Sequence, residues 1–235
     1  MCGRFLNSLP PAEAARLFRT KNVAPNYAAR FNIAPTDAVL AVRWNSKTGE
    51  RSLDALRWGL IPYGARDMSM AARLINARSE TLATTAAFRD AFARRRCLIP
   101  ASGFYEWRKD GKARVPYAIL PKDAPLFAFA GLWENWRDPA AGPDAPWVRS
   151  CAIVTGEPNP LIAPIHSRMP VILPEDAWAE WLGEAPAAAG GLSRLLKPYP
   201  AERMRLYPVS PRVNSVKNDD SSLPEPLMAE GGIAV

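Results

Sequence analysis

Histidine and cysteine are scarce in this chain. Its 235 residues include one histidine, His166, and three cysteines, Cys2, Cys97 and Cys151. These four residues fall in no metal-binding spacing, so the sequence predicts neither a zinc site nor another metal or cofactor site. An odd number of cysteines argues against a disulfide framework. A catalytic triad that needs histidine would have to use His166.

Long apolar runs and a recognisable targeting segment are also lacking. No stretch of about 18 apolar residues is present, which excludes a membrane-spanning helix. The first residues, MCGRFLNSLPPAEAARLF, lack the basic start and the apolar stretch of a secretion signal. We therefore expect a cytoplasmic protein that associates with the nucleoid when it binds DNA. Hydrophobic residues make up 48% of the chain, which excludes disorder throughout.

Lysine is rare among the basic residues, and arginine is abundant. The chain has 30 Lys and Arg against 23 Asp and Glu, a net charge of +7, and 23 of the basic residues are arginine. The arginine fork binds phosphate at two points and stacks on bases, which favours a nucleic-acid partner. A general arginine bias, accompanied by many alanines and prolines, is the alternative explanation.

The pattern of short elements predicts one α+β domain over residues 1–222, with a curled, mostly antiparallel β-sheet and short flanking helices. Twenty-four prolines favour short elements over long helices. Helices are expected at 9–19, 85–93, 177–182 and 192–196, and strands at 37–44, 52–58, 97–100, 104–108, 115–120, 126–133, 147–155 and 205–209. Residues 183–191 are expected to form a surface loop, and 223–235 a flexible tail.

Cys2 offers unusual chemistry, because a small residue at position 2 normally permits removal of Met1. Cys2 would then carry a free amine and a thiol on adjacent carbons. The amine condenses with an aldehyde to a Schiff base, and the thiol closes on the imine carbon to give a thiazolidine ring. In model compounds the amine titrates at about 7.7–8.0 and the thiol at about 8.5, so both are nearly ready at neutral pH. A chance cysteine at position 2 is the alternative.

Further candidate residues occur in three short motifs. Arg4 can hold a phosphate beside the reacting group, and Trp58 could stack on a base or lie in the core. Asn76 can orient a thiol or an amine, and Arg78 can bind a phosphate, although the same motif also suits a capped helix start. Each of these roles fits its residue type without requiring it.

Two residues are candidates for proton transfer. Glu106 lies among three aromatic residues in FYEW, where partial desolvation would raise its pKa toward neutrality. An outward-facing glutamate on an alternating strand is the alternative. His166 has the side chain best suited to proton transfer at neutral pH, although a single histidine is more often structural.

Taken together, these segments resemble the SRAP (SOS response-associated peptidase) family. The resemblance runs from residue 1 to about 222 and keeps the expected order of motifs. The matching segments are MCGRF at 1–5, RWGLIP at 57–62, NARSET at 76–81, CLIPASGFYEW at 97–107, TGEPN at 155–159, HSRMP at 166–170 and PVSPRVNSVKNDD at 208–220.

The resemblance implies a compact α+β fold and a positively charged groove for single-stranded DNA. It implies that Cys2 is the nucleophile toward the aldehyde of an abasic site and that Asn76 positions it. It further implies that Glu106 handles protons and that His166 assists opening of the sugar ring. The DNA contacts that it implies are Arg4, Trp58, Arg78, Trp107, Thr155 and Arg168. We expect the protein to act as a monomer.

Three functions therefore compete. The first is a covalent shield for abasic sites in single-stranded DNA, formed through Cys2 during the DNA damage response. The second is a thiol peptidase that cleaves itself or other proteins. The third is a single-strand binder without covalent chemistry.

Overall fold

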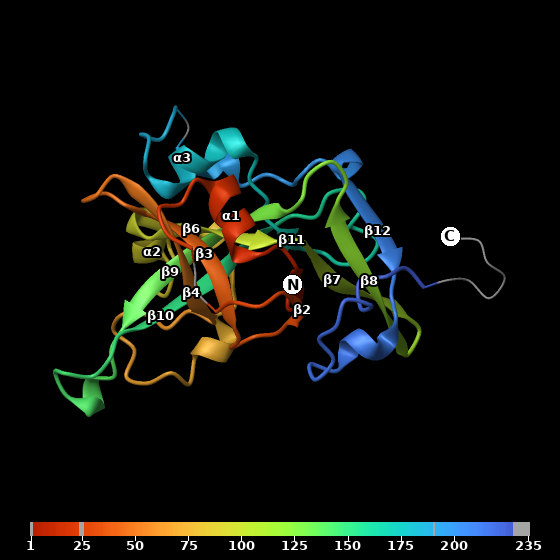
Figure 1. The fold of residues 1–235 in the computed structure, drawn as a ribbon, viewed down its shortest axis with the longest axis horizontal. Coiled ribbons are helices and arrows are strands. Elements are labelled where there is room, and N and C mark those ends of the chain that lie inside the picture. The colour runs from red at the N-terminus through yellow and green to blue at the C-terminus, as the bar shows by residue number, and fades with distance from the viewer. Residues whose placement is uncertain (1, 24–25, 190, 228–235) are drawn as a thin grey trace.

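The structure, a computed structural model, describes residues 2–23, 26–189 and 191–227, and its larger sheet closes on itself. Each strand of the ring pairs with two neighbours, in the order β4, β3, β6, β9, β10 and back to β4. The ring consists of β3 (Ala38–Asn45), β4 (Glu50–Trp58), β6 (Arg96–Ala101), β9 (Phe127–Trp136) and β10 (Val148–Gly156). The result is a small barrel, at the left of Figure 1.

Two short strands extend the barrel at β10. The strand β5 (Asn76–Arg78) runs parallel to β10, and β11 (Met169–Pro170) runs antiparallel to it. The pairing of β4 with β10 is also parallel, whereas the other barrel pairings are antiparallel. These two parallel pairings are the exceptions within a fold whose predicted mostly antiparallel, curled character is confirmed.

The second sheet has five strands and lies at the right of Figure 1. Its order is β12 (Met204–Pro208), β8 (Ala113–Pro121), β7 (Gly103–Asp110), β1 (Phe5–Asn7) and β2 (Arg30–Ile33). The strand β7 follows β6 after a single residue, Ser102, so the chain passes directly from the barrel into this sheet. The start of the chain, marked N in Figure 1, therefore lies between the two sheets.

Short helices cover the outside of the barrel. The α-helices are α1 (Pro11–Phe18), α2 (Arg89–Arg94) and α3 (Trp178–Leu182). Single 3₁₀ turns lie at Ala71–Arg73, Ser79–Thr81, Pro139–Ala141, Glu175–Ala177, Leu192–Leu195, Ala201–Arg203 and Pro211–Asn214. None of the helices within the described residues is long and apolar enough to cross a membrane.

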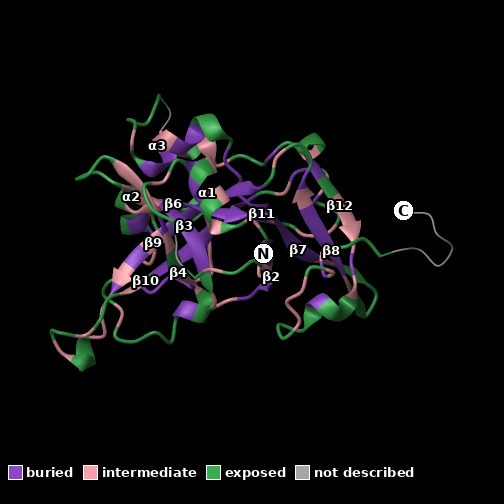
Figure 2. Cartoon of the chain, viewed as in Figure 1, coloured by how far each residue is buried: buried purple, intermediate pink, exposed green. Residues whose placement is uncertain are grey.

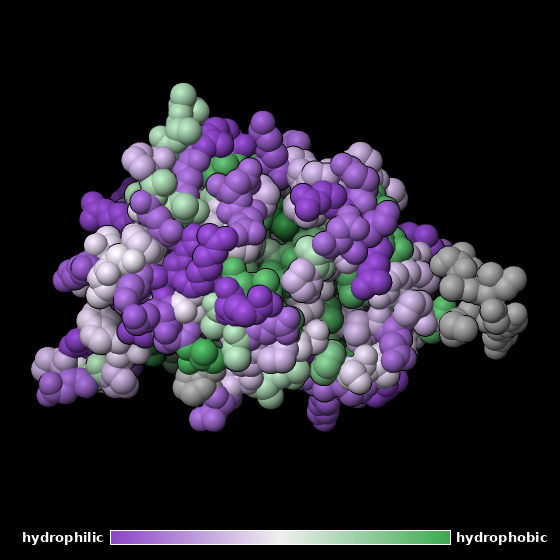
Figure 3. Space-filling view, turned by 45° about the horizontal axis from the view of Figure 1, so that its top comes forward, coloured by the Kyte–Doolittle hydropathy of each residue, from purple (hydrophilic) through white to green (hydrophobic). Residues whose placement is uncertain are grey.

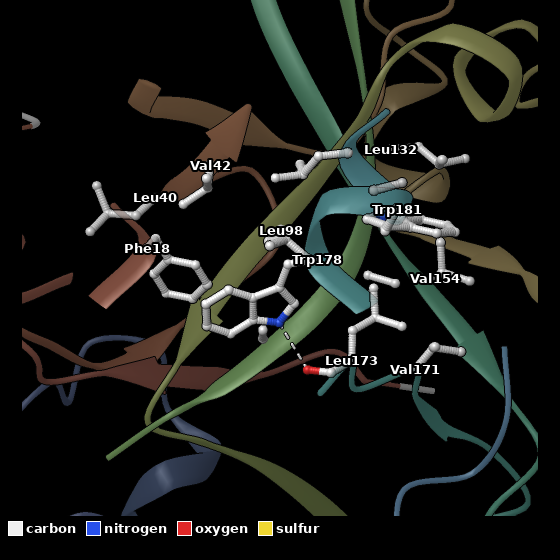
Figure 4. Close-up of a cluster of buried hydrophobic side chains, with 14 of the residues drawn as sticks. Phe18, Leu40, Val42, Leu98, Leu132, Val154, Val171, Leu173, Trp178 and Trp181 are labelled. Atoms are coloured by element: carbon white, nitrogen blue, oxygen red, sulfur yellow. Dashed lines mark hydrogen bonds between the residues drawn. The ribbon is translucent and has the colours of Figure 1, made fainter. Parts of the chain in front are cut away.

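Alternation along the barrel strands divides the apolar residues into two cores. Leu40 and Val42 of β3 pack outward with Phe18, Trp178 and other residues of α1 and α3; this is the helix-side core. In Figure 4 the rings of Phe18 and Trp178 stack, with centroids 4.4 Å apart, and Trp178 donates a hydrogen bond to the carbonyl oxygen of Leu173.

The intervening residues of β3, Val39 and Ala41, face the other way. They belong to the site-side core, which fills the barrel interior and continues toward the second sheet. Cys2, Phe5 and Trp58 are part of it, and each is buried. Figure 2 shows the buried positions gathered on the strands of both sheets.

Two of the predicted helices and the predicted C-terminal tail differ from what the structure shows. Of the helix expected at 85–93, only Arg89–Arg94 is α-helical, because the chain turns at Thr85 and Phe88 before the helix begins. The helix expected at 192–196 is a 3₁₀ turn. Part of the predicted tail is packed: Leu223 is fully buried, and the Leu227 amide donates to the carbonyl oxygen of Pro208. Residues 228–235 of that tail lie outside the described residues.

Candidate functional site

Cys2 is fixed by the strand that follows it. Phe5 of β1 pairs with Phe104 of β7, and the Tyr105 amide donates to the carbonyl oxygen of Arg4 over 2.9 Å. This register continues the chain beside β7 and places Cys2 in the site-side core, where its side chain is fully buried. Burial, with a further contribution from the charge of Glu106, raises the pKa of the Cys2 thiol well above its usual value. The thiol is therefore held in its protonated form.

Asn76 reaches Cys2 from the other sheet. Its strand β5 lies parallel to β10, with Asn76 opposite Ile153. The side-chain amide donates to the carbonyl oxygen of Cys2 over 2.8 Å. Its oxygen Oδ1 is buried and accepts no hydrogen bond from any residue that the structure describes. Since a buried acceptor without a donor costs free energy, this oxygen is available to a group that arrives next to Cys2.

Glu106 lies on the face of β7 that is turned toward Cys2. Side chains alternate along a strand, so Glu106 shares a face with Phe104, which belongs to the same core as Cys2. The glutamate side chain is only 3% exposed. Burial raises the pKa of its carboxyl group to about 7, as the aromatic setting of Glu106 led us to expect. At neutral pH this carboxyl group can therefore both accept and release a proton.

His166 is held by the backbone of its own turn and of Arg168. It follows a turn in which the His166 amide donates to the carbonyl oxygen of Ile162 over 2.9 Å. Nδ1 lies 3.0 Å from the backbone amide of Arg168, from which it accepts in one tautomer, and 3.2 Å from the carbonyl oxygen of Arg168, to which it donates in the other. Partial burial lowers the pKa of the imidazole. The ring is therefore neutral at pH 7 and carries one N–H group, on Nε2 in the first of these tautomers.

Glu106 and His166 line one cavity of about 670 Å³. Its other walls are Trp107, Lys109 and Arg114 from the β7–β8 hairpin, and residues 164–167 from the loop before β11. Figure 3 shows that the face between the two sheets is hollowed, with hydrophobic side chains in the hollow and hydrophilic ones around it. Asn76, Glu106 and His166 thus come from three separate elements: β5, β7 and the loop after β10.

Arg78 and Arg168 differ in how they are held. Arg78 is exposed, and its guanidinium makes no hydrogen bond or ion pair with a described residue. Arg168 forms a two-pronged ion pair with Glu80, at 2.7 and 2.9 Å, and also donates to the carbonyl oxygen of Thr155. The Thr155 side chain is buried, 3.5 Å from Arg168. Of the arginines predicted to contact DNA, Arg78 is the one that can meet a phosphate without losing a hydrogen bond or an ion pair to a described residue.

Arg4 and Trp107 are tied to the end of the domain. Arg4 donates to Asn32 Oδ1 over 2.7 Å and to the carbonyl oxygen of Val213 over 2.8 Å. Its guanidinium lies 5.8 Å from the centre of the Trp107 ring, and the indole N–H of Trp107 donates to Asn214 Oδ1. Both predicted DNA contacts therefore also hold the segment 213–219 in place.

The predicted base stacking on Trp58 does not agree with its position. Its ring is fully buried at the end of β4, and it packs edge-on against Phe5 with centroids 5.1 Å apart. The indole N–H donates to the carbonyl oxygen of Ile75 over 2.9 Å. Trp58 thus lies in the core, which was the alternative interpretation. It supports β1 through Phe5, and it supports Ile75, the residue before Asn76, through its N–H group.

The motif analysis missed Asn32. This side chain is fully buried, and besides receiving the hydrogen bond from Arg4 it donates to the carbonyl oxygens of Ser215 and Asn218 at 3.0 and 2.7 Å. Asp219 also fixes the segment 213–219 to β2, because it accepts hydrogen bonds from the backbone amides of Phe31 and Asn32. The sequence does offer a signal for Asn32, which is a polar residue between Phe31 and Ile33. A side-chain amide in an apolar strand is usually buried only where it has hydrogen-bond partners.

The sequence profile of the SOS response associated peptidase (SRAP) family matches residues 1–216. The abasic site processing protein YoqW of Bacillus subtilis (strain 168) is 40% identical over 228 residues, which cover 96% of this chain and 99% of YoqW. The abasic site processing protein YedK of Escherichia coli (strain K12) is 30% identical, over 97% of this chain and all of YedK.

A solved structure also shares the fold. A crystal structure of a protein from Bacteroides thetaiotaomicron superimposes with a TM-score of 0.86. It covers 97% of this chain and 100% of that protein, at 23% sequence identity. At this level of identity the likeness concerns the fold alone, and it extends to both sheets, since almost the whole chain is covered.

Proposed function

The chain belongs to the SOS response-associated peptidase (SRAP) family, and on that premise we propose that it forms a covalent bond between Cys2 and abasic sites in single-stranded DNA. The observation that carries the proposal is the convergence of Asn76 and Glu106 on Cys2. Its relatives YoqW and YedK, both named as abasic site processing proteins, support the choice of substrate. The cross-link would shield the lesion from strand breakage during the DNA damage response.

The reaction begins with removal of Met1, because only then does Cys2 carry a free α-amine. The amine nitrogen attacks the aldehyde carbon of the ring-opened sugar, and loss of water gives an imine. The thiol sulfur then adds to the imine carbon, and the thiol proton goes to the nitrogen. A five-membered thiazolidine closes, with no oxidant, reductant or metal required.

Each residue around Cys2 has a proposed part in this sequence. Glu106, with a pKa of about 7, takes a proton from the aminothiol and returns it to the departing water. The buried Oδ1 of Asn76 accepts a hydrogen bond from the amine and so directs it. In the tautomer with the proton on Nε2, His166 protonates or hydrogen-bonds the sugar oxygen during ring opening. The exposed Arg78 and the cations of the β7–β8 hairpin bind the flanking phosphates.

A peptidase activity is the second candidate, favoured by the family description and by the pairing of a cysteine with a proton-accepting glutamate. Cleavage of the Met1–Cys2 bond by the protein itself is the form of this activity that fits the site. It needs only one turnover, because the product is the nucleophile of the second reaction. A binder without covalent chemistry would leave the position of Cys2 between Asn76 and Glu106 without a use.

The test mixes the purified protein, as a monomer of verified intact mass, with single-stranded DNA that carries one abasic site. We expect a species that survives boiling in detergent on a denaturing gel in the wild type, and none with Cys2→Ala. Cys151→Ala serves as the matched control, because it removes another buried thiol and should leave the cross-link in place.

Two outcomes would decide against the proposal. A stable adduct with Cys2→Ala would move the chemistry to another residue. A wild-type protein that lacks Met1, binds the strand and yet forms no stable adduct would leave the non-covalent binder as the function. Cys2→Ser separates the two chemical steps, because it keeps the amine but not the thiol. It should give an imine that borohydride traps, and no stable ring.

A further inference from the structure

The barrel has a second open end, opposite the end that holds Cys2. The strands β4, β6 and β10 end near the site, at Trp58, Ala101 and Gly156. The opposite end of the barrel is therefore formed by the last residues of β3 and the first residues of β4 and β10. The turn between β3 and β4, orange in Figure 1, lies at this far end, away from the chain start marked N. We call this region the distal mouth. It contains a cavity of about 580 Å³.

Charged and aromatic side chains replace apolar ones inside the barrel at the distal mouth. By alternation, Arg43 of β3 shares the inward face with Val39 and Ala41. Its guanidinium lies 4.4 Å from the centre of the Trp133 ring and forms an ion pair with Asp54 at 2.8 Å. Arg149 approaches the same carboxylate to 3.9 Å. The single carboxylate of Asp54 thus lies within ion-pair distance of both Arg43 and Arg149.

The rim adds cations that are not neutralised. Six cationic side chains line the cavity, against one carboxylate, that of Glu50. Arg51 is paired with Glu184, and Lys21 lies 3.5 Å from Glu50. Lys47 and Arg94 are exposed and make no ion pair with any residue that the structure describes. The distal mouth therefore has an excess of positive charge around two half-buried tryptophans, Trp44 and Trp133.

We propose that the distal mouth binds a nucleotide of a single DNA strand, at a distance from the nucleotide that reacts with Cys2. Free cations attract the phosphate, and half-buried indoles provide a surface for a base, which is the combination that single-strand binders use. The cavity volume lies in the range of small-molecule sites, about 300–1,000 Å³, and so accommodates one nucleotide. The proposal rests on the proposed function only in that the strand is DNA, because it requires no chemistry at Cys2.

The test compares unmodified oligothymidylates of about 8 and about 30 nucleotides, the shorter being close to the span of a single binding surface. The variant is Lys47→Glu/Arg94→Glu, and the matched control is Lys122→Glu/Arg205→Glu, which reverses two exposed charges at the β8–β12 edge of the second sheet. Equilibrium binding is measured by fluorescence anisotropy over a range of salt concentrations. Cross-linking of a short strand with an abasic site is followed in parallel.

For the long strand we expect Lys47→Glu/Arg94→Glu to weaken binding on the order of tenfold more than the control does. Its salt slope should fall by about 1.4, which corresponds to two phosphates at about 0.7 each. Binding and cross-linking of the short strand should not change. The proposal fails if both lengths lose the same affinity, or if variant and control agree. It also fails if the variant loses binding of thymidine 5′-monophosphate while the long strand binds normally, which would identify a free nucleotide as the ligand.

None of these failures touches the covalent chemistry. A protein whose distal mouth is inert can still cross-link a short strand, and a protein that forms no cross-link can still show the dependence on strand length. Trp44→Ala adds a second variant that keeps every charge. It should weaken binding of the long strand without changing the salt slope, because it removes a stacking surface and no phosphate contact.

Discussion

The two cores of this molecule are built from neighbouring residues of the same strands, yet they hold different chemistry. Leu40 and Val42 face the helix-side core, which is apolar throughout the described residues. Val39 and Ala41 face the site-side core, which ends in Cys2 and lies against Glu106. Burial in the first core stabilises the fold. Burial at the edge of the second changes the protonation of a thiol and a carboxyl group.

The comparison shows that a site of this kind draws on the stability of its surroundings. A buried glutamate with a pKa of about 7 is a group that water would hold in its charged form at neutral pH. Keeping it in place costs free energy, which the apolar packing of the rest of the fold, including the helix-side core, offsets. The five predictions below test this division of labour.

The largest effect is expected in the helix-side core. Phe18→Ala removes a fully buried ring that stacks on Trp178, and such truncations cost about 3–5 kcal/mol. Urea unfolding should show this loss, whereas the cross-linking rate per folded molecule should not change, because Phe18 contacts no residue of the site. Phe18→Leu is the control and should cost much less. A slower reaction in the folded fraction of Phe18→Ala would mean that the two cores do not act independently.

The next effect concerns Glu106. Glu106→Gln should slow cross-linking about 10²-fold, the lower end of the range for proton-transfer groups. In the wild type the rate should rise with pH through about 7, as the carboxyl group loses its proton. The variant should lose this limb and keep only the rise near pH 8 that comes from the α-amine. Identical pH profiles would show that Glu106 does not transfer the proton.

The Glu106 carboxyl group should also make the free energy of unfolding depend on pH, and Glu106→Gln should remove this dependence. The pKa of Glu106 is raised from 4.5 to about 7 on folding, so the folded protein binds a proton more tightly than the unfolded chain. The wild type should therefore lose up to about 3 kcal/mol as the pH rises from about 4.5 to 7, and no more above that. Glu106→Gln should not show this loss. Urea unfolding at pH 5 and at pH 8 measures the difference between the two proteins.

His166 should have a smaller effect. His166→Ala should slow the early phase of cross-linking about tenfold and leave the endpoint unchanged, because ring opening governs how often the aldehyde is present and not whether it reacts. Time courses on strands with one abasic site give both values. His166→Gln keeps an N–H donor and should recover part of the early rate. An altered endpoint would instead place His166 in the stability of the adduct.

The smallest effect is expected at Arg78. Since this side chain is exposed and makes no ion pair with a described residue, Arg78→Ala should weaken non-covalent binding a few-fold and lower the salt slope by about 0.7. Lys122→Ala, which removes another exposed cation beside the β8–β12 edge, is the control. If the slope is the same for both variants, Arg78 does not contact a phosphate, and the charge of the groove comes from other residues.

The sequence predicts well what depends on neighbouring residues. Alternation located β3, β4 and β10 to within one or two residues, and the aromatic neighbours of Glu106 indicated its burial. The parallel pairing of β10 with β4 and β5 was not predictable, because about 75 residues separate Asn76 from Ile153 and no local pattern records the partner. The same limit applies to Trp58. A tryptophan at the end of a strand has the same local sequence pattern in a core as in a binding groove, and only the position of the second sheet distinguishes the two.

The closure of the segment 213–219 over Arg4 and Asn32 has a consequence for the timing of activity in a growing chain. Ribosomes deliver Cys2 well before this segment, and domains fold as their residues emerge. The residues that hold Arg4 and Trp107 in place are therefore absent during most of synthesis. On the proposed mechanism, a nascent or truncated chain would carry Cys2 without the complete surroundings that direct it. If Cys2 reacts as proposed, its full reactivity would depend on this segment, and a chain still in synthesis would be spared premature capture by other aldehydes.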